Sequence, residues 1–290
     1  MSYINIMIND RKIKARQGDT IMEAAKQVGI KIPALCLMPE LKFRPGSCRI
    51  CVVEVVGSPA LVASCVYPVR TNMQIYTHSN RVLKARRMIL ELILANHPLD
   101  CMTCEKSGSC VLEDLAYQFG IKTFLFSPNR KQLPIDDSNP FIVREMSKCV
   151  LCGRCVEICN EIQQSHIIDF AHRGLDVKIA AQGDVDLKDS DCVFCGQCVA
   201  VCPVGALIDK EARGKGRSWE FQKVYTTCNY CGCGCGFDLN IKDGKVVKVT
   251  SNPDSIVNGI NLCVKGRFGN DYIHRDYRLT IPLIKKDGKL

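Results

Sequence analysis

The chain holds 20 cysteines in 290 residues, and most of them stand two to four positions from another cysteine. Thiolates that are so close in sequence serve as ligands for iron–sulfur clusters or for zinc. The densest pattern, C-x2-C-x2-C-x3-C, occurs twice, over 149–159 and over 192–202, and Pro203 follows the second copy. Three thiolates separated by two residues each can wrap one cubic cluster. Zinc sites commonly use pairs of C-x2-C, so a doubled triple run favours clusters.

This doubled run resembles the two-cluster bacterial ferredoxins, in which the fourth cysteine of each run ligates the other cluster. The resemblance implies two [4Fe–4S] clusters with crossed ligand sets. One set, called here the first centre, is Cys149, Cys152, Cys155 and Cys202. The other set, called the second centre, is Cys159, Cys192, Cys195 and Cys198.

Four cysteines near the N-terminus follow the spacing C-x11-C-x2-C-x13-C, namely Cys36, Cys48, Cys51 and Cys65. One close pair with two outlying cysteines suits a planar [2Fe–2S] cluster, as in plant-type ferredoxins, although those have a shorter first gap. Zinc is the alternative. The segment 45–55 resembles the [2Fe–2S] domain that begins the large electron-input subunit of respiratory complex I, and also certain iron-only hydrogenases and formate dehydrogenases. The resemblance implies a [2Fe–2S] centre here.

A histidine precedes the next cysteine group in the pattern H-x3-C-x2-C-x5-C, formed by His97, Cys101, Cys104 and Cys110. A lone histidine is more often structural, but this one completes a set of four ligands. The pattern resembles a [4Fe–4S] site of the same family in which one histidine replaces a cysteine. The resemblance implies a His97 centre, and replacing a thiolate with a neutral imidazole should raise its reduction potential.

The last group follows C-x2-C-x3-C-x27-C and comprises Cys228, Cys231, Cys235 and Cys263. With the following Val-Lys-Gly-Arg-Phe, it resembles the first domain of molybdenum/tungsten bis-pterin oxidoreductases, particularly formate dehydrogenases. The resemblance implies a fourth [4Fe–4S] cluster, the C-terminal centre, and gives Lys265 a role in the contact between cluster and redox partner. Cys233 is left over, either as a free thiol or as a substitute for Cys231 or Cys235.

The motifs divide an α+β chain into four iron–sulfur modules. We expect a β-grasp [2Fe–2S] ferredoxin domain over 1–78 and a helix with the His/Cys3 [4Fe–4S] segment over 79–126. A two-[4Fe–4S] ferredoxin domain is expected over 138–211. A small β-rich [4Fe–4S] domain of the Mo/W-bis-pterin type, truncated, is expected over 221–290.

Local signals predict several elements that position these motifs. Hairpins are expected around Asn9-Asp10 (strands 3–8 and 13–15) and around Asp243-Gly244 (strands 237–241 and 246–250), because both pairs suit tight turns. Helices are expected over 21–28, 80–96 and 111–119, and a polar linker over 127–140. Basic residues recur at helical spacing in the second helix, where we expect a solvated face: Arg81, Lys84, Arg86 and Arg87.

The composition argues against several other classes of protein. The formal charge is +9, but five clusters with their ligands would add about −9, which leaves the loaded protein near neutral and argues against nucleic-acid binding. Disulfide frameworks belong to short secreted chains. The sequence starts with a strand pattern instead of a signal peptide, and its longest apolar run, 88–95, is too short to span a membrane. A reducing cytoplasm is the expected location.

Taken together, the resemblance covers essentially the whole chain and matches the amino-terminal part of cytoplasmic formate dehydrogenase alpha subunits without their molybdopterin domains. We expect one [2Fe–2S] and four [4Fe–4S] clusters, no molybdopterin and no catalytic residue. The first hypothesis is an electron-transfer subunit of an anaerobic hetero-oligomeric complex. Its partners would be a flavin/NAD(P)H subunit, ferredoxin and a hydrogenase or formate dehydrogenase subunit, with electron bifurcation as one mode. The alternatives are a fragment of a formate dehydrogenase catalytic subunit and a ferredoxin-like reservoir or assembly factor.

Overall fold

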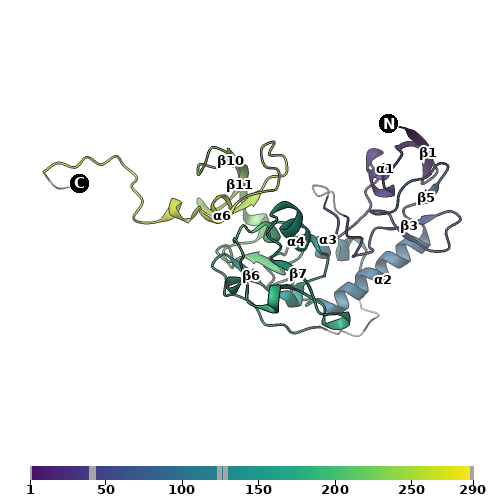
Figure 1. The fold of residues 1–290 in the computed structure, drawn as a ribbon, viewed down its shortest axis with the longest axis horizontal. Helices are drawn as coiled ribbons and strands as arrows, with labels where there is room; N and C mark the ends of the chain where they lie inside the picture. Colours follow the sequence, from purple (N-terminus) through teal and green to yellow (C-terminus); the bar gives the residue numbers. More distant parts are fainter. Residues whose placement is uncertain (1, 39–43, 123–125, 127–129, 288–290) are drawn as a thin grey trace.

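The computed structural model describes residues 2–38, 44–122, 126 and 130–287. The modules follow one another along the long axis of the molecule (Figure 1). The N-terminal sheet lies at one end, short strands and helices occupy the middle, and a small sheet with an extended tail lies at the other end. Residues 127–129 of the predicted linker lie outside the described part.

The N-terminal module is a five-stranded mixed sheet in the order β2-β1-β5-β3-β4. β1 (Tyr3–Ile8) pairs antiparallel with β2 (Arg11–Arg16) and parallel with β5 (Gln74–Tyr76). β3 (Val52–Val55) pairs antiparallel with β5 and with β4 (Val62–Ala63). The long excursion between β2 and β3 carries the first cysteines of the [2Fe–2S] motif, so the sheet fixes both ends of that loop.

The predicted N-terminal hairpin is confirmed. Asn9 and Asp10 have φ of +49° and +63°, which suits a two-residue turn between antiparallel strands. The helix that follows, α1 (Ile21–Gln27), ends one residue earlier than predicted. Its start is fixed by a capping box, in which the Glu23 amide donates to Thr20 Oγ1 at 3.3 Å and the Thr20 amide donates to Glu23 Oε2 at 2.8 Å.

Helix α2 (Asn80–Asn96) has the predicted bounds and connects the N-terminal sheet to the middle of the molecule (Figure 1). The expectation of a solvated basic face is wrong for Arg86, which is 4% exposed. Its Nε and Nη2 atoms donate to the carbonyl of Val52 at 3.2 and 2.8 Å. This carbonyl follows Cys51 directly, so a buried guanidinium supports the loop of the [2Fe–2S] motif.

The middle module contains two small antiparallel strand pairs and two short helices that lie within the cysteine runs. β6 (Ile142–Arg144) pairs with β9 (Leu207–Asp209), and β7 (Ile168–Ala171) pairs with β8 (Lys178–Ala181). The two helices are α4 (Arg154–Glu157) and α5 (Gln197–Val201). The preceding segment contains α3 (Val111–Gln118). Helix α3 is one residue shorter than predicted. Single helical turns cover Met146–Lys148, Ile158–Ile162, Gly174–Asp176, Gln182–Asp184, Leu187–Asp189, Ser218–Glu220 and Asp271–His274.

The C-terminal module is a three-stranded antiparallel sheet in the order β10-β11-β12, followed by helix α6 (Val264–Phe268). The strands are β10 (Gln222–Thr227), β11 (Gly236–Lys242) and β12 (Lys245–Ser251). The hairpin predicted across Asp243-Gly244 is confirmed, with longer strands than expected. Both turn residues have positive φ, +51° and +72°.

Buried apolar side chains form two large clusters, and one of them crosses the module boundaries. One lies within the N-terminal sheet and includes Ile6, Ile8 and Ile75. The other combines α2 and α3 with the middle module, and it also contains Cys36 and Cys48 of the N-terminal module. The [2Fe–2S] loop is therefore buried against its neighbour. Within the described residues, no helix is both long enough and apolar enough to span a bilayer.

Helix α2 supplies a test of this shared core. Leu90 is 0% exposed and belongs to the core that joins the modules, whereas Leu92 on the same helix is 44% exposed. Leu90→Ala should destabilise the protein by about 2–5 kcal/mol because it leaves a cavity. Leu92→Ala should change stability by less than about 0.5 kcal/mol. Anaerobic denaturant unfolding measures both, and equal effects would contradict the shared core.

Candidate iron–sulfur centres

The middle module contains two cavities, and each is lined by four of the predicted cluster ligands. The cavity of the first centre is lined by Cys149, Cys152, Cys155 and Cys202. The cavity of the second centre is lined by Cys159, Cys192, Cys195 and Cys198. In each case one sulfur comes from the opposite cysteine run.

The same backbone turn builds both centres. Leu151 and Phe194, each two residues after the first cysteine of a run, have φ of +52° and +54°. Their amides donate to the sulfurs of Cys149 and Cys192, both at 3.4 Å. A glycine with left-handed backbone then precedes each helix, Gly153 before α4 and Gly196 before α5. Amide groups directed at sulfur stabilise thiolates, as cluster ligation requires.

The surroundings of these thiols fit iron–sulfur clusters. Burial raises the pKa of Cys149 to about 12 and that of Cys152 to about 11, and it holds the pKa of Cys155 well above the ordinary value. Buried thiolates need a positive partner, which cluster iron supplies when it is bound. The zinc alternative needs four ligands around one ion. In the part of the chain that the structure describes, no group of three or more His, Cys, Asp or Glu is arranged to hold a single metal ion.

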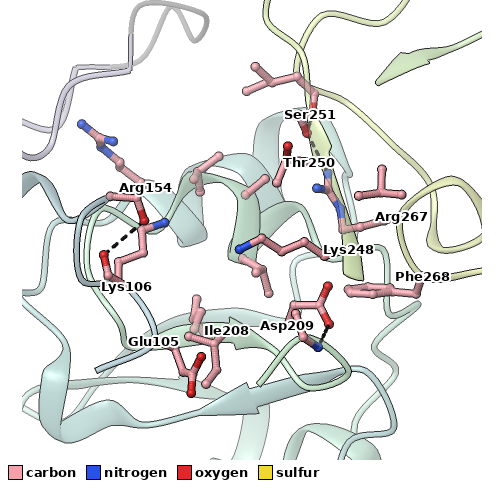
Figure 2. A pocket seen from close by; sticks show the side chains of 18 of the residues that line it. Glu105, Lys106, Arg154, Ile208, Asp209, Lys248, Thr250, Ser251, Arg267 and Phe268 are labelled. Carbon is pink, nitrogen blue, oxygen red and sulfur yellow. Dashed lines mark hydrogen bonds between the residues drawn. The ribbon is translucent and has the colours of Figure 1, made fainter. Parts of the chain in front are cut away.

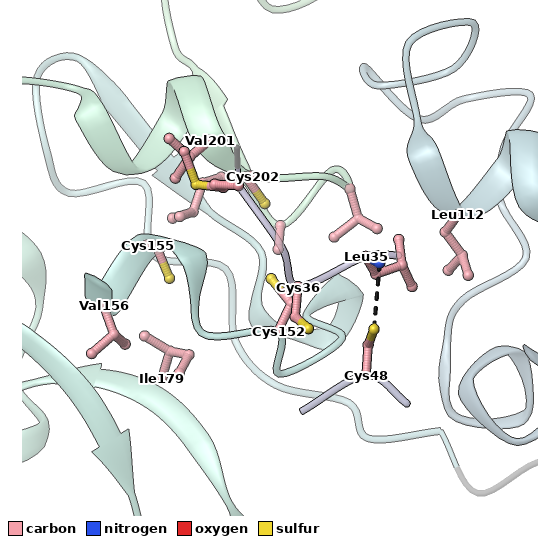
Figure 3. Packing of buried hydrophobic residues seen from close by; sticks show 14 of the residues in the cluster. Leu35, Cys36, Cys48, Leu112, Cys152, Cys155, Val156, Ile179, Val201 and Cys202 are labelled. Carbon is pink, nitrogen blue, oxygen red and sulfur yellow. Dashed lines mark hydrogen bonds between the residues drawn. The ribbon is translucent and has the colours of Figure 1, made fainter. Parts of the chain in front are cut away.

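The four cysteines of the predicted [2Fe–2S] centre are all buried and lie together. The sulfurs of Cys51 and Cys65 are 3.4 Å apart, and the Leu35 amide donates to Cys48 Sγ at 3.4 Å (Figure 3). Hydrogen bonds from the thiols of Cys48 and Cys65 hold the pKa of Cys36 far below its usual range, and the same contacts raise the pKa of both donors. The set fits a cluster bound by thiolates.

The predicted His97 centre combines a buried imidazole with three cysteines. His97 is 7% exposed, burial lowers its pKa to about 4, and its Nδ1 has no hydrogen-bond partner among the described residues. A neutral imidazole with a free buried nitrogen is the form that binds metal. Cys104 and Cys110 are buried, whereas Cys101 is exposed. Gly205 of the middle module closes the site, because a Cβ on it would lie 2.7 Å from Cys104 Sγ.

The C-terminal centre is the most open of the five. Cys228 is buried, while Cys231 and Cys263 are exposed. The Cys228 amide donates to the carbonyl of Cys235 at 2.7 Å, and helix α6 begins directly after Cys263. The backbone amide and thiol of Cys233 hydrogen-bond to the Cys231 sulfur and lower the pKa of Cys231. The leftover cysteine therefore lies among the predicted ligands.

Buried basic residues beside these centres were not singled out from the sequence. Lys148 is 5% exposed and forms ion pairs of 3.0 Å with both Asp100 and Glu145, between His97 and Cys149. Arg267 is also 5% exposed and donates to the Cys195 carbonyl at 3.1 Å. Lys148 directly precedes a cysteine run, and Arg267 lies two residues after Lys265 in the same motif. Their positions next to predicted ligand motifs are therefore the sequence signal that could have identified these two basic residues.

Fold and sites together define a multi-cluster iron–sulfur protein with one [2Fe–2S] domain and several [4Fe–4S] domains. Four family models match successive parts of the chain. These are a 2Fe-2S iron–sulfur cluster binding domain over 2–80 and the NADH-ubiquinone oxidoreductase-G iron–sulfur binding region over 86–124. The ferredoxin-like domain of NADH-quinone oxidoreductase subunit 3 matches 139–208, and the molybdopterin oxidoreductase Fe4S4 domain matches 221–275.

A solved structure identifies the family. A chain of the NAD+-reducing [NiFe]-hydrogenase in its H2-reduced state is 33% identical, with a TM-score of 0.64 over 73% of this chain and 90% of that one. The protein belongs to the family of iron–sulfur subunits that includes this hydrogenase chain and the G-type subunits of NADH-quinone oxidoreductases.

Curated relatives agree with this assignment. A G-type subunit of NADH-quinone oxidoreductase from Rhizobium meliloti is 33% identical over 99% of this chain. The alpha subunit of the NADPH-Fe(3+) oxidoreductase of Geobacter sulfurreducens is 35% identical over 97%, and subunit 3 of the Thermus thermophilus NADH-quinone oxidoreductase is 31% identical over 99%. The chain spans only 33%, 33% and 40% of their lengths. None of these three is a formate dehydrogenase, so that part of the sequence-based resemblance stays a hypothesis.

The contact between Gly205 and Cys104 gives a test of the His97 centre. Gly205→Ala should displace the Cys104 sulfur, so iron content should fall by about four atoms per chain and the EPR signal of one [4Fe–4S] cluster should disappear. Leu92→Ala is the control, because Leu92 is 44% exposed and lies outside every predicted ligand motif. Full iron and an unchanged spectrum in Gly205→Ala would contradict the proposed position of this centre.

Proposed function

We propose that the chain is an electron-relay subunit that carries one [2Fe–2S] and four [4Fe–4S] clusters in the ligand sets given above. Such clusters pass single electrons, and the protein sets their spacing and potential. The observation that carries the proposal is that loops of neighbouring centres are hydrogen-bonded to each other. In this arrangement the middle module is the point where the other modules meet.

The [2Fe–2S] loop contacts the first centre directly. Ser47 Oγ donates to the carbonyl of Cys152 at 3.1 Å, and Arg154 Nη2 donates to the carbonyl of Leu37, next to Cys36, at 2.8 Å. Figure 3 shows Cys36 and Cys152 within one buried cluster. An electron leaving the [2Fe–2S] centre would therefore meet the first centre next.

The His97 segment approaches the first centre from another side. The Val111 amide, directly after Cys110, donates to the carbonyl of Pro203, directly after Cys202, at 3.0 Å. Arg217 donates to the carbonyl of Cys104 at 2.6 Å, which fastens the loop of this centre to the connection between the last two modules. These contacts support a branch at the first centre, with the [2Fe–2S] and His97 centres as its two neighbours.

The C-terminal module contacts the second centre. Helix α6, which follows Cys263, places Arg267 on the carbonyl of Cys195 at 3.1 Å. The ring of Phe268 stacks on Phe141, with centroids 5.0 Å apart and planes at 8°. A side chain at Gly196 would overlap Arg267 and Phe268. The proposed route therefore leaves the middle module through the second centre.

The partners follow from the relatives by analogy. NADH-quinone oxidoreductase, NADPH-Fe(3+) oxidoreductase and NAD+-reducing hydrogenase all have a nicotinamide in their names. We accordingly place a flavin/NAD(P)H subunit at one terminal of the relay and a hydrogenase or formate dehydrogenase subunit, or ferredoxin, at another. A cytoplasmic, hetero-oligomeric and electron-bifurcating complex belongs to the same proposal.

A second candidate function is the front part of a longer molybdenum/tungsten enzyme such as formate dehydrogenase. The observation that favours it is the match of 221–275 to the Fe4S4 domain of molybdopterin oxidoreductases. The clusters would then pass electrons to or from a pterin site in the same polypeptide. The downstream reading frame distinguishes the two: a continuous pterin domain supports the enzyme, and a stop codon beside flavoprotein or hydrogenase genes supports the relay subunit.

Native anaerobic purification tests the relay. We expect about 18 iron atoms per chain, from one [2Fe–2S] and four [4Fe–4S] clusters, together with flavin and hydrogenase or formate dehydrogenase subunits in fixed ratio. Iron analysis and mass spectrometry of the purified complex measure both. An iron content well below that value would contradict the count of five clusters. A monomer that exchanges freely between enzymes would contradict a relay with a fixed place in a complex.

The ligand role of His97 predicts a change in potential. His97→Cys keeps four ligands but replaces a neutral imidazole with a thiolate, so the added negative charge should lower the midpoint potential of one [4Fe–4S] cluster by on the order of 100 mV. An EPR-monitored redox titration reads this shift, with His78→Cys as the control because His78 is outside every predicted ligand set. An unchanged potential with full iron would show that His97 is not a ligand.

A further inference from the structure

Arg267 lies at the junction between the second centre and the C-terminal centre. It is in the last turn of α6, its amide donates to the Cys263 carbonyl at 3.0 Å, and its guanidinium reaches the carbonyl of Cys195. One residue therefore contacts a predicted ligand of each centre, through its backbone at Cys263 and its side chain at Cys195. Figure 2 shows it beside Ser251 and Phe268, at the edge of a cavity of about 390 Å³.

Every acceptor that Arg267 contacts is neutral. Besides the Cys195 carbonyl, Nη2 donates to Gln197 Oε1 and to Ser251 Oγ, both at 3.1 Å. Within the described residues the guanidinium forms no ion pair. Asp209 lines the same cavity, but its Oδ1 accepts the amides of Glu211 and Ala212.

A buried guanidinium without a carboxylate partner is energetically unfavourable. Arginine stays protonated in proteins, and an isolated buried charge is strongly unfavourable unless an opposite charge compensates it. Arg144 illustrates the usual solution nearby, since it is 7% exposed and pairs with Asp136 at 3.2 Å. The negative groups whose charge acts on Arg267 are the thiolate ligands at Cys195 and Cys198 on one side and Cys263 on the other, together with the Asp209 carboxylate, which forms no ion pair with the guanidinium.

We propose that Arg267 is the shared counter-ion of the second centre and the C-terminal centre, and that its charge raises the reduction potential of both. This inference rests on the relay function proposed above. Each centre becomes more negative by one unit when it accepts an electron, so a fixed positive charge beside it favours the reduced form. Arg267 is a positioning residue in this scheme: it exchanges neither proton nor electron, and it holds two neighbouring centres at potentials that suit transfer between them.

Potentials measured on the full, cluster-loaded chain test the proposal. Arg267→Gln removes the charge but keeps hydrogen-bonding groups, and Arg267→Lys keeps the charge. In Arg267→Gln we expect the equilibrium between reduced and oxidised cluster to shift at least tenfold toward the oxidised form at both centres, which is about 59 mV for one electron. Arg267→Lys should remain close to the parent. Signals are assigned by their loss in Cys192→Ser for the second centre and in Cys228→Ser for the C-terminal centre, because Cys233 is a possible substitute ligand for Cys231 or Cys235.

Controls separate a charge effect from damage to the fold. Arg275→Gln removes a charge from the same end of the chain at an exposed residue paired with Asp271, so the potentials should not move. If Arg267→Gln loses iron while Arg267→Lys keeps it, the charge is needed and the proposal holds. Loss of iron in both variants, or full iron with unshifted potentials in Arg267→Gln, overturns it. If the parent itself lacks the Cys192-dependent signal, the relay assignment fails instead, whatever Arg267 does.

Discussion

The burial of thiolates is the constraint on which the rest of this structure depends. A thiolate inside protein is unfavourable without positive charge beside it, and ten of the 20 cysteines are buried while only four are exposed. Iron supplies part of that charge, and buried basic side chains supply more. Arg86 lies behind Cys51, and Arg267 lies between the second and C-terminal centres. The excess of 39 basic over 30 acidic residues is thus partly a property of the interior.

The same constraint explains why the modules are not independent. A [2Fe–2S] loop carried only by the N-terminal sheet would face water on one side. Here Cys36 and Cys48 belong to the core that also holds Cys152 and Cys155 (Figure 3). Ser47 donates to a carbonyl of the first centre. The module that carries one predicted centre therefore covers the ligand loop of its neighbour. The same contacts that shield the cysteines from water bring the two ligand sets close together.

Local patterns predicted the elements well, whereas contacts between modules could not be read from them. The turns at Asn9-Asp10 and Asp243-Gly244 and the bounds of α2 depend on neighbouring residues, and all were confirmed. Arg86 was expected in solvent because helical spacing cannot reveal that the Val52 carbonyl lies opposite. The ligand sets rest on recurring cysteine spacing, and they stay predictions. Arg267 was overlooked because its importance comes from Cys195, which lies 72 residues earlier in sequence.

Tight packing at the junctions has a direct consequence for electron transfer. Gly205 touches the Cys104 sulfur, and Gly196 leaves no room for a side chain beneath Arg267 and Phe268. A methyl group at either position would displace the side chain that packs against the glycine. Electron transfer slows as centres separate, and these two glycines stand where the predicted ligand loops of neighbouring centres meet. In the proposed relay, these glycines would therefore help to set the distances between one-electron carriers.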